Sequence, residues 1–240
     1  MRNASAWIAI TPAEISYFES FGIPASRVTV IPNGISQENF PEQDTKAFRY
    51  SRGLSDHPII LFMGRLNTIK GPDLLMKAFL SIHRLIPDFH LVFAGPDEGM
   101  QSALHEMAKQ GEISDRVHFL GYVGGDEKSA AYHAASVLVV PSRQEAMSIV
   151  ALEAGICGTP VIVTDQCGFS EIKSLDPDLE VPASAEGIAN GLIYLLTRFG
   201  KREEVATSFR KFVSQRYSWD VIVEKYLHLY RGLLNVSGIK

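Results

Sequence analysis

Two short apolar runs, residues 137–140 and 161–164, constrain the fold of this chain more than any other feature. Both are rich in β-branched residues and neither alternates apolar with polar side chains, which is typical of strands covered on both faces. Between them, residues 148–156 predict a helix and residues 158–160 predict the turn that follows it. A strand, a helix and a second strand in this order predict a βαβ unit and therefore a parallel sheet.

The same alternation continues on both sides of this unit. Further strands are predicted at residues 59–63, 90–94 and 117–120, with a weak edge strand near residues 180–181. Helices are predicted at residues 72–85, 100–110, 126–135 and about 185–199, with helical sequence from there to the end. Strand alternating with helix through six cycles predicts an α/β fold in which right-handed crossovers join a doubly wound, parallel, Rossmann-like sheet.

The front of the chain does not follow this regular pattern. Residues 7–11 and 28–31 predict two short strands around a helix that begins at Pro12 and is ended by Gly22, and a polar stretch follows. We therefore expect the tail end of a preceding α/β domain at residues 1–35, a linker at 36–56, a Rossmann-like domain at 57–215 and a C-terminal helix at 216–240.

Charge and cysteine content limit the partners and the compartment. With 23 Lys and Arg residues against 27 Asp and Glu residues, the net charge is −4, so bulk electrostatics favour neither nucleic acid nor an anionic membrane. No run approaches the ~18 apolar residues of a membrane-spanning helix. The two cysteines, Cys157 and Cys167, lack metal-ligand spacing and favour buried thiols over a disulfide, which indicates a reducing, cytoplasmic compartment.

Two basic residues follow the first predicted strand of the regular part. Gly64-Arg65 comes directly after residues 59–63, and Lys70-Gly71 opens the next predicted helix, so a guanidinium and an ammonium can converge beside a helix N-terminus. The alternative is that both are ordinary solvated surface charges. The stretch has neither the phosphate-binding loop nor the glycine fingerprint of a dinucleotide fold, so it signals neither an ATPase nor a hydride-transfer enzyme.

Two carboxylates, Glu145 and Glu153, lie eight residues apart around the start of the helix at 148–156. Taken singly, Glu153 has the composition of a solvated helix former. However, ligands of parallel sheets bind at the strand exits, and paired carboxylate oxygens suit the vicinal hydroxyls of a sugar or a ribose. The Asp176-Pro177-Asp178 pair resembles a metal motif but lies in a polar loop, which favours a turn.

Several short motifs occur along the chain in a fixed order. They are Pro32-Asn33-Gly34, Gly64-Arg65-Leu66 with Lys70-Gly71, Ala94-Gly95, Gly121-Tyr122, Pro141-Ser142, Glu145-x7-Glu153-Ala154, Gly158-Thr159-Pro160-Val161, residues 168–171 and Tyr217-Ser218-Trp219. In joint order and spacing, these motifs resemble the C-terminal, donor-binding half of a family 4 retaining glycosyltransferase of the GT-B fold, from Thr11 to about Leu234. The resemblance implies transfer of a hexose from a UDP- or GDP-sugar to a saccharide or lipid-linked acceptor, in polysaccharide biosynthesis, with no metal and no other cofactor.

The resemblance also implies roles for individual residues. Arg65, which follows Gly64, and Lys70 would hold the diphosphate and stabilise the charge of the leaving group. Glu145 would bind hydroxyls of the donor sugar. Glu153 would bind the ribose. Backbone amides of Met147, Ser148 and Ile149 would face sugar and phosphate, and the base would lie near Tyr122 and Val123, for which simple strand-end packing is an equal alternative.

The chain departs from the family in ways that affect the donor and the acceptor. Relatives commonly carry an aromatic residue and a glycine where it has Met147 and Ser148, and many carry a glycine at Cys167, so the donor sugar stays open. Relatives also have an N-terminal acceptor domain, which we expect to be missing here. Such a domain would act in cis or in trans. The protein would associate with the inner membrane face through that domain. The terminal helix would leave an apolar surface where that domain packs.

Two other classes of protein fit the same residues. One is a nucleotide-sugar-binding module or subunit without turnover. Assaying hydrolysis by the chain alone and by the chain with an N-terminal fragment would distinguish it from a transferase. The other is a GT-B epimerase or phosphorylase. An epimerase would release free sugar epimer, and a phosphorylase would need a cofactor lysine in place of the plain charge pair at Arg65 and Lys70.

Overall fold

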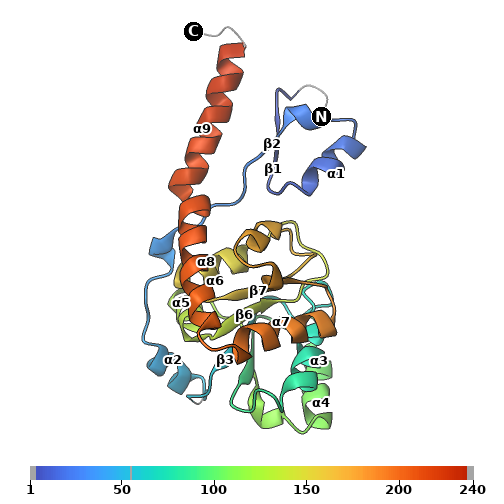
Figure 1. Ribbon diagram of the computed structural model, residues 1–240, viewed down its shortest axis with the longest axis vertical. Coiled ribbons are helices and arrows are strands. Elements are labelled where there is room, and N and C mark those ends of the chain that lie inside the picture. The colour runs from blue at the N-terminus through green and yellow to red at the C-terminus, as the bar shows by residue number, and fades with distance from the viewer. Residues whose placement is uncertain (1–3, 55, 237–240) are drawn as a thin grey trace.

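A computed structural model describes residues 4–54 and 56–236 of the chain. Within these residues the main sheet has six strands, all parallel, in the order β5-β4-β3-β6-β7-β8 (Figure 1). The strands are β3 (Ile59–Met63), β4 (His90–Ala94), β5 (Val117–Gly121), β6 (Val137–Val140), β7 (Val161–Thr164) and β8 (Glu180–Val181).

The central strands are buried along their whole length, as their unbroken apolar runs predict. Every residue of β3, β6 and β7 is buried, and β3 pairs with β6 through Ile60 opposite Val137 and Leu61 opposite Leu138. The strand order is that of a doubly wound dinucleotide-type sheet, and it reverses between β3 and β6. The predicted α/β class with a Rossmann-like parallel sheet is therefore confirmed.

Two groups of helices cover the sheet (Figure 1). In the first group, α3 packs on α4 and α7, and in the second, α6 packs on α5 and α8. A side chain at Gly155 of α6 would overlap the rings and methyls of Phe209 and Val213, so the glycine permits the close approach of α8. These helices are α3 (Pro72–Ile82), α4 (Gln101–Gln110), α5 (Gly125–Ala134), α6 (Ile149–Cys157), α7 (Ala185–Thr197) and α8 (Lys201–Tyr217).

The segment from residue 36 to residue 56 contributes to the core of the large unit. It contains the helix α2 (Thr45–Ser51), whose N-cap Asp44 accepts hydrogen bonds from the backbone amides of Lys46 and Ala47 at 3.0 Å. Phe48 of α2 and Leu54 beyond it are buried in the main hydrophobic core. The sequence pattern did not reveal this helix because it spans only seven residues and presents a single buried side chain.

A small N-terminal unit and a long terminal helix complete the described chain (Figure 1). Strands β1 (Trp7–Ala9) and β2 (Val28–Val30) pair in parallel beside α1 (Glu14–Ser20), and α9 (Trp219–Val236) extends away from the large unit. The chain between them is anchored where Ile35 forms a bridge with Ser218. A side chain at Gly34 would overlap the ring of Trp219, so two motifs far apart in sequence meet here.

The domain boundaries expected from the sequence remain a prediction. Residues 1–3, Ser55 and residues 237–240, which belong to the predicted first, second and last segments, lie outside the described residues. The described helices include none that is both long and apolar enough to cross a membrane.

Candidate functional site

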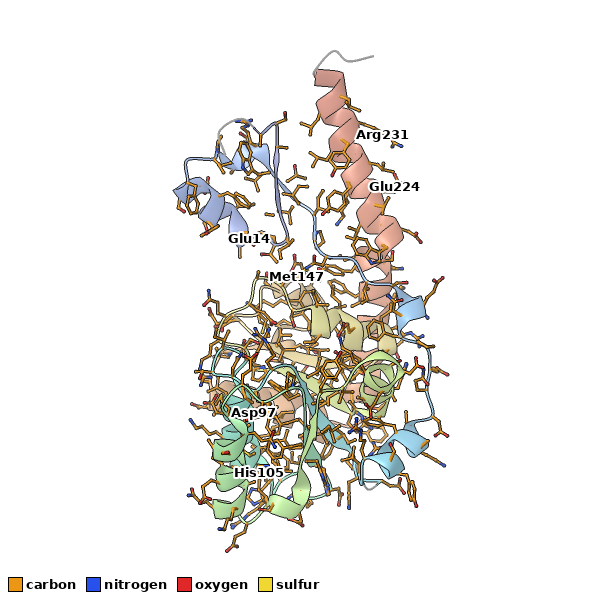
Figure 2. All side chains as sticks on the ribbon, turned by 180° about the vertical axis from the view of Figure 1, so that it is seen from behind. Glu14, Asp97, His105, Met147, Glu224 and Arg231 are labelled. Carbon is orange, nitrogen blue, oxygen red and sulfur yellow. The ribbon has the colours of Figure 1, made fainter. Side chains whose placement is uncertain are left out.

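The candidate site lies at the carboxyl ends of β3 and β6, the two neighbouring strands between which the strand order reverses. The loop after β3 carries Arg65 and Lys70, and the loop after β6 carries Glu145. In open parallel sheets this reversal opens the crevice in which ligands bind. In Figure 2, Met147 of the second loop lies on the side of the large unit that faces Glu14 of the N-terminal unit.

Backbone hydrogen bonds extend the pairing of β3 and β4 beyond the sheet. The amide of Gly64 donates to the carbonyl of Ala94 at 2.9 Å, that of Leu66 to Pro96 at 2.9 Å, and that of Glu98 to Leu66 at 3.2 Å. The two loops run so close that a side chain at Gly95 would meet the carbonyl oxygen of Gly64 at 1.9 Å. Arg65 is therefore held beside the loop that follows β4.

Arg65 contacts a carboxylate that the sequence analysis did not identify. Its Nη1 lies 3.1 Å from Oε1 and 3.3 Å from Oε2 of Glu98, and its side chain is 56% exposed. Asn67 Nδ2 donates to the same carboxylate at 2.7 Å. The hydrogen bonds from Asn67 and Arg65 lower the pKa of Glu98, which keeps it ionised at neutral pH.

Lys70 and Glu145 are in direct contact, as an ion pair between the two loops. Gly71 follows in the left-handed conformation, with φ of 69°, and its Cβ position would meet the carbonyl oxygen of Pro141 at 2.1 Å. Only glycine fits such an approach. The structure thus brings together one cation and one carboxylate that the sequence placed 75 residues apart.

The loop that carries Glu145 is held against the loop that follows β7, but one oxygen of the Glu145 carboxylate is not engaged. The Glu145 amide donates to the carbonyl of Gln166 at 2.9 Å, and Gly168 lies against the carbonyl of Ala146. Within the described chain, Glu145 Oε2 and the hydroxyls of Ser142 and Ser148 are buried without a hydrogen-bond partner. Buried polar atoms of this kind usually have partners, so three of them in one loop point to a ligand.

Helix α6 begins directly after this loop. Ser148 is its N-cap residue but makes no side-chain capping bond, Met147 is buried and Ile149 is nearly half exposed. The first amides of the helix therefore have no intrahelical acceptor and can bind an anion.

Glu153, on α6, is held by two side chains of the neighbouring helix α5. Lys128 Nζ lies 2.6 Å from Oε1, and the fully buried hydroxyl of Tyr132 donates to Oε2 at 2.6 Å. Burial and the Glu153 carboxylate raise the pKa of Tyr132, so this tyrosine stays a hydrogen-bond donor. Glu153 is 8% exposed, and the sequence alone did not point to either partner.

Tyr122 and Val123 differ in exposure. Tyr122 is 76% exposed at the end of β5 and its ring lies over Gly124, whereas Val123 is 5% exposed and belongs to the core. The burial of Val123 is consistent with strand-end packing, an exposed ring at Tyr122 suits a planar ligand, and the base site at these two residues stays a prediction.

Arg143 is a structural residue of the site that the sequence analysis also missed. Its Nη1 and Nη2 donate to the two oxygens of Asp73, at 2.8 and 2.7 Å, and Nη1 also donates to the carbonyl of Thr68. Burial alone would raise the pKa of Asp73, but the hydrogen bonds and charge of Arg143 lower it overall. Its position three residues after the apolar run of β6 was the only signal in the sequence.

The remaining motif residues have structural surroundings. Cys157 and Cys167 are buried free thiols, as expected, and burial raises the pKa of Cys167 to about 11. Asp176 accepts the amide of Asp178 at 3.0 Å, which is the predicted turn, and also binds Tyr194 and Lys201. No group of three candidate ligands that could hold a metal occurs among residues 4–54 and 56–236.

A hollow of about 970 Å³ lies at the other edge of the sheet, near the amino ends of β3 and β4. Its lining includes His57, Phe89 and Phe199, and it includes none of the residues discussed above. We place the candidate site at the strand exits because three buried polar atoms without a partner and the Lys70–Glu145 ion pair lie there.

Comparison with known proteins identifies the family of this chain. The family model described as glycosyl transferases group 1 matches residues 44–212. An uncharacterized glycosyltransferase from Methanocaldococcus jannaschii is 34% identical over 225 residues, which cover 91% of this chain and 57% of that protein. A D-inositol 3-phosphate glycosyltransferase from Acidothermus cellulolyticus is 32% identical over 224 residues, which cover 89% and 50%.

Solved structures share the fold. Sucrose-phosphate synthase from Thermosynechococcus elongatus superposes with a TM-score of 0.79 at 26% identity, covering 98% of this chain and 59% of that one. Anabaena HepE in complex with UDP superposes with a TM-score of 0.84 at 22% identity, covering 98% and 65%. The chain spans about half the length of the curated relatives it matches.

Proposed function

Because the chain belongs to the glycosyl transferases group 1 family, we propose that it binds the donor in a retaining glycosyltransferase that moves a hexose from a nucleoside diphosphate sugar. The observation that carries the proposal is the contact of Lys70 with Glu145 at the strand reversal, with an unpartnered carboxylate oxygen beside it. This site offers a cation that can bind a phosphate and a hydrogen-bond acceptor that can bind a hydroxyl. Recognition of a nucleotide sugar requires both.

Arg65 and Lys70 would bind the diphosphate and stabilise the negative charge that develops on it as the bond to the sugar breaks. The backbone amides of Met147, Ser148 and Ile149, in the loop before α6 and at its start, would add dipolar stabilisation from the facing loop. Two cations and a helix terminus supply the charge that a metal supplies in other nucleotide-sugar enzymes, so we propose that no metal is needed.

Glu145 would bind the donor sugar. Its Oε1 is paired with Lys70 and its Oε2 is free to accept a sugar hydroxyl, so one side chain would couple recognition of the sugar to the position of the cation. The buried hydroxyls of Ser142 and Ser148 lie in the same loop and would donate to or accept from the same ligand.

Glu153 and Tyr122 would bind the nucleoside. A carboxylate can accept about four hydrogen bonds, so Glu153 keeps acceptor capacity for ribose hydroxyls although Lys128 and Tyr132 hold its two oxygens. The exposed ring of Tyr122 would stack on the base. We propose a UDP- or GDP-sugar donor, and the HepE complex with UDP gives a precedent on a similar fold.

The acceptor would be a saccharide or a lipid-linked saccharide, bound by an N-terminal acceptor domain in cis or in trans. The length of the curated relatives, about twice that of this chain, supports this part of the proposal. In this arrangement residues 57–215 form the donor-binding domain, residues 216–240 cross toward the acceptor domain, and any membrane contact is made by that domain.

Replacing Arg65 with alanine tests the diphosphate site. A charge-assisted contact contributes about 1.5 to 3 kcal/mol, so Arg65→Ala should weaken binding of UDP or GDP by roughly ten- to a hundredfold and leave the free nucleoside unchanged. Calorimetric titration measures both. Arg84→Ala, which removes an exposed guanidinium beyond the end of α3, is the matched control. Equal losses for nucleoside and diphosphate would place the ligand elsewhere.

A further inference from the structure

Both cations of the candidate diphosphate site are paired with carboxylates that come from different loops. Lys70 contacts Glu145 of the loop after β6, and Arg65 contacts Glu98 of the loop after β4. Glu145 already has a proposed role in binding the sugar. Glu98 has none, although the backbone pairing of Leu66 with Pro96 and Glu98 holds it beside Arg65.

We propose that Glu98 is a specificity-determining counter-ion, which competes with the phosphates of the ligand for Arg65 and so sets how strongly the site prefers a diphosphate. The inference rests on the proposed function, because it requires that Arg65 bind the diphosphate. It adds a residue from a third strand exit to the site.

The contact is built so that Glu98 can yield to a ligand. Both of its oxygens face a single nitrogen of Arg65, Nη1, and the two side chains are 56% and 40% exposed. Exposed ion pairs of this kind are weak, and a guanidinium has five N–H donors, so a phosphate can take the other donors or replace the carboxylate. In either case the negative charge of Glu98 lies beside that of the phosphates.

Asn67 connects this counter-ion to the second cation. Its Nδ2 donates to Glu98 at 2.7 Å while its Oδ1 accepts from the backbone amide of Lys70 at 2.9 Å. The amide orientation is fixed, because only the nitrogen can donate to a carboxylate and only the oxygen can accept from a backbone amide. Neutralising Glu98 while keeping an acceptor there should therefore preserve the loop from Arg65 to Lys70.

The effect must increase with the charge of the ligand, since it arises from repulsion and competition between anions. Glu98→Gln should raise the affinity for UDP and GDP by about two- to fivefold at low ionic strength, and raise the affinity for the monophosphates less. The affinity for the nucleosides should stay unchanged. Added salt should reduce the gain. A glutamine can still accept from Asn67, so the loop keeps its geometry.

The test is calorimetric titration of UDP, UMP and uridine, and of the guanine series, with the parent chain, Glu98→Gln and Glu224→Gln. Glu224 lies on α9, far from Asp97 and the loop after β4 (Figure 2). Its variant therefore changes the net charge as Glu98→Gln does, but away from the site. Thermal unfolding of each variant checks that the fold is kept. Glu98→Gln in an Arg65→Ala background should bring no gain, because the competition acts through Arg65.

The outcomes separate this inference from the proposed function. If Arg65→Ala weakens the diphosphate but Glu98→Gln leaves it unchanged or weakens it, the counter-ion role is overturned and the diphosphate site stands. An equal gain with Glu224→Gln, or a gain that persists without Arg65, would also overturn it as a nonspecific charge effect. If Arg65→Ala leaves diphosphate binding unchanged, both proposals fail together.

Discussion

Three of the carboxylates that line or support the site, Asp73, Glu145 and Glu153, differ in how many of their oxygens are engaged. Both oxygens of Asp73 are held by Arg143, and both oxygens of Glu153 are held by residues of α5. Glu145 pairs with Lys70 through one oxygen only. The three side chains are similar in chemistry, but their surroundings suit Asp73 to support of the loops and Glu145 to direct contact with a ligand.

Glutamine substitutions distinguish the roles of Glu145 and Glu153. Glu145→Gln should bind UDP or GDP no more weakly than the parent but bind the intact nucleotide sugar roughly ten times more weakly, because a charge-assisted bond to a sugar hydroxyl is lost. Glu153→Gln should weaken all ligands that carry the ribose hydroxyls. Titrating each variant with nucleoside diphosphate and with nucleotide sugar measures the difference.

Each of these variants serves as the control for the other, because both remove one negative charge from the same βαβ unit. Undiminished affinity of Glu145→Gln for the nucleotide sugar would exclude Glu145 from sugar binding. Glu153→Gln also weakens a buried contact with Lys128 and Tyr132, so its free energy of unfolding must be measured beside its affinity.

The sequence suggested which residues could carry the chemistry, and this stays a prediction, but it did not indicate which side chains hold them. Arg65, Lys70 and Glu145 could be placed at strand exits because apolar runs locate strands and the exits of parallel strands share one edge. The partners of Arg65 and Glu153, which are Glu98 and the pair Lys128 and Tyr132, come from other strands and helices. Such contacts depend on loop paths and rotamers, which have no periodic signal.

At the scale of elements, the loops of the site approach one another so closely that glycine is required. Gly71 begins α3 against the carbonyl of Pro141, and Gly168 lies against that of Ala146. The first contact joins the loop that carries Lys70 to the loop that carries Glu145, so the distance between the two charged groups depends on it.

Gly71→Ala should destabilise the fold more than Gly200→Ala. Both glycines are N-cap residues with φ near 70°, so both variants carry the same ~1–2 kcal/mol penalty of left-handed backbone. Only Gly71 also meets a backbone oxygen, at 2.1 Å, whereas nothing lies within 4 Å of the Cβ position at Gly200. The overlap should add about 1–3 kcal/mol to the loss in free energy of unfolding. Chemical denaturation of the two variants measures the difference, and equal losses would contradict the close contact.

Element positions were predictable to different degrees. The runs at β3, β4, β6 and β7 predict the observed strands residue for residue, because a buried strand ends where its apolar run ends. Helix ends were less certain. The pattern extended α3 to residue 85, but the helix ends at Ile82 and Leu85 is 63% exposed, since an apolar residue can follow a helix without belonging to its buried face.

At the scale of the whole molecule, the large unit is built on a doubly wound sheet, and the parts outside it also carry exposed apolar side chains. On α9 these are Trp219, Val223, Tyr230 and Leu234, and on or beside α1 they are Tyr17 and Phe21. Figure 1 shows both elements extending from one side of the large unit. The proposed acceptor domain would pack on this side, which is also the side of Met147 (Figure 2).

Transfer with retention, the reaction proposed above, would make demands that the proposed donor site alone does not meet. The acceptor oxygen must be held within reach of the anomeric carbon, on the same face as the leaving phosphate. Proximity of this kind can lower the barrier by about 7 to 11 kcal/mol. The proposed leaving-group stabilisation by Arg65, Lys70 and the start of α6 would act on the donor, the other partner of the reaction. Closure of a second domain over the donor would also exclude water.

We therefore expect the 240-residue chain by itself to bind a nucleotide sugar but to transfer the sugar at a negligible rate. Adding an N-terminal acceptor domain of the same family, fused to the chain or supplied as a separate polypeptide, should raise the transfer rate by several orders of magnitude, since it provides both proximity and closure. Incubation with a radiolabelled donor and an extract of candidate acceptors measures transfer, and calorimetry in parallel measures donor binding. The Arg65→Ala variant is the control for transfer that does not pass through this site. Rapid transfer by the chain alone would contradict the expectation, and would mean that the small N-terminal unit and α9 already form an acceptor site.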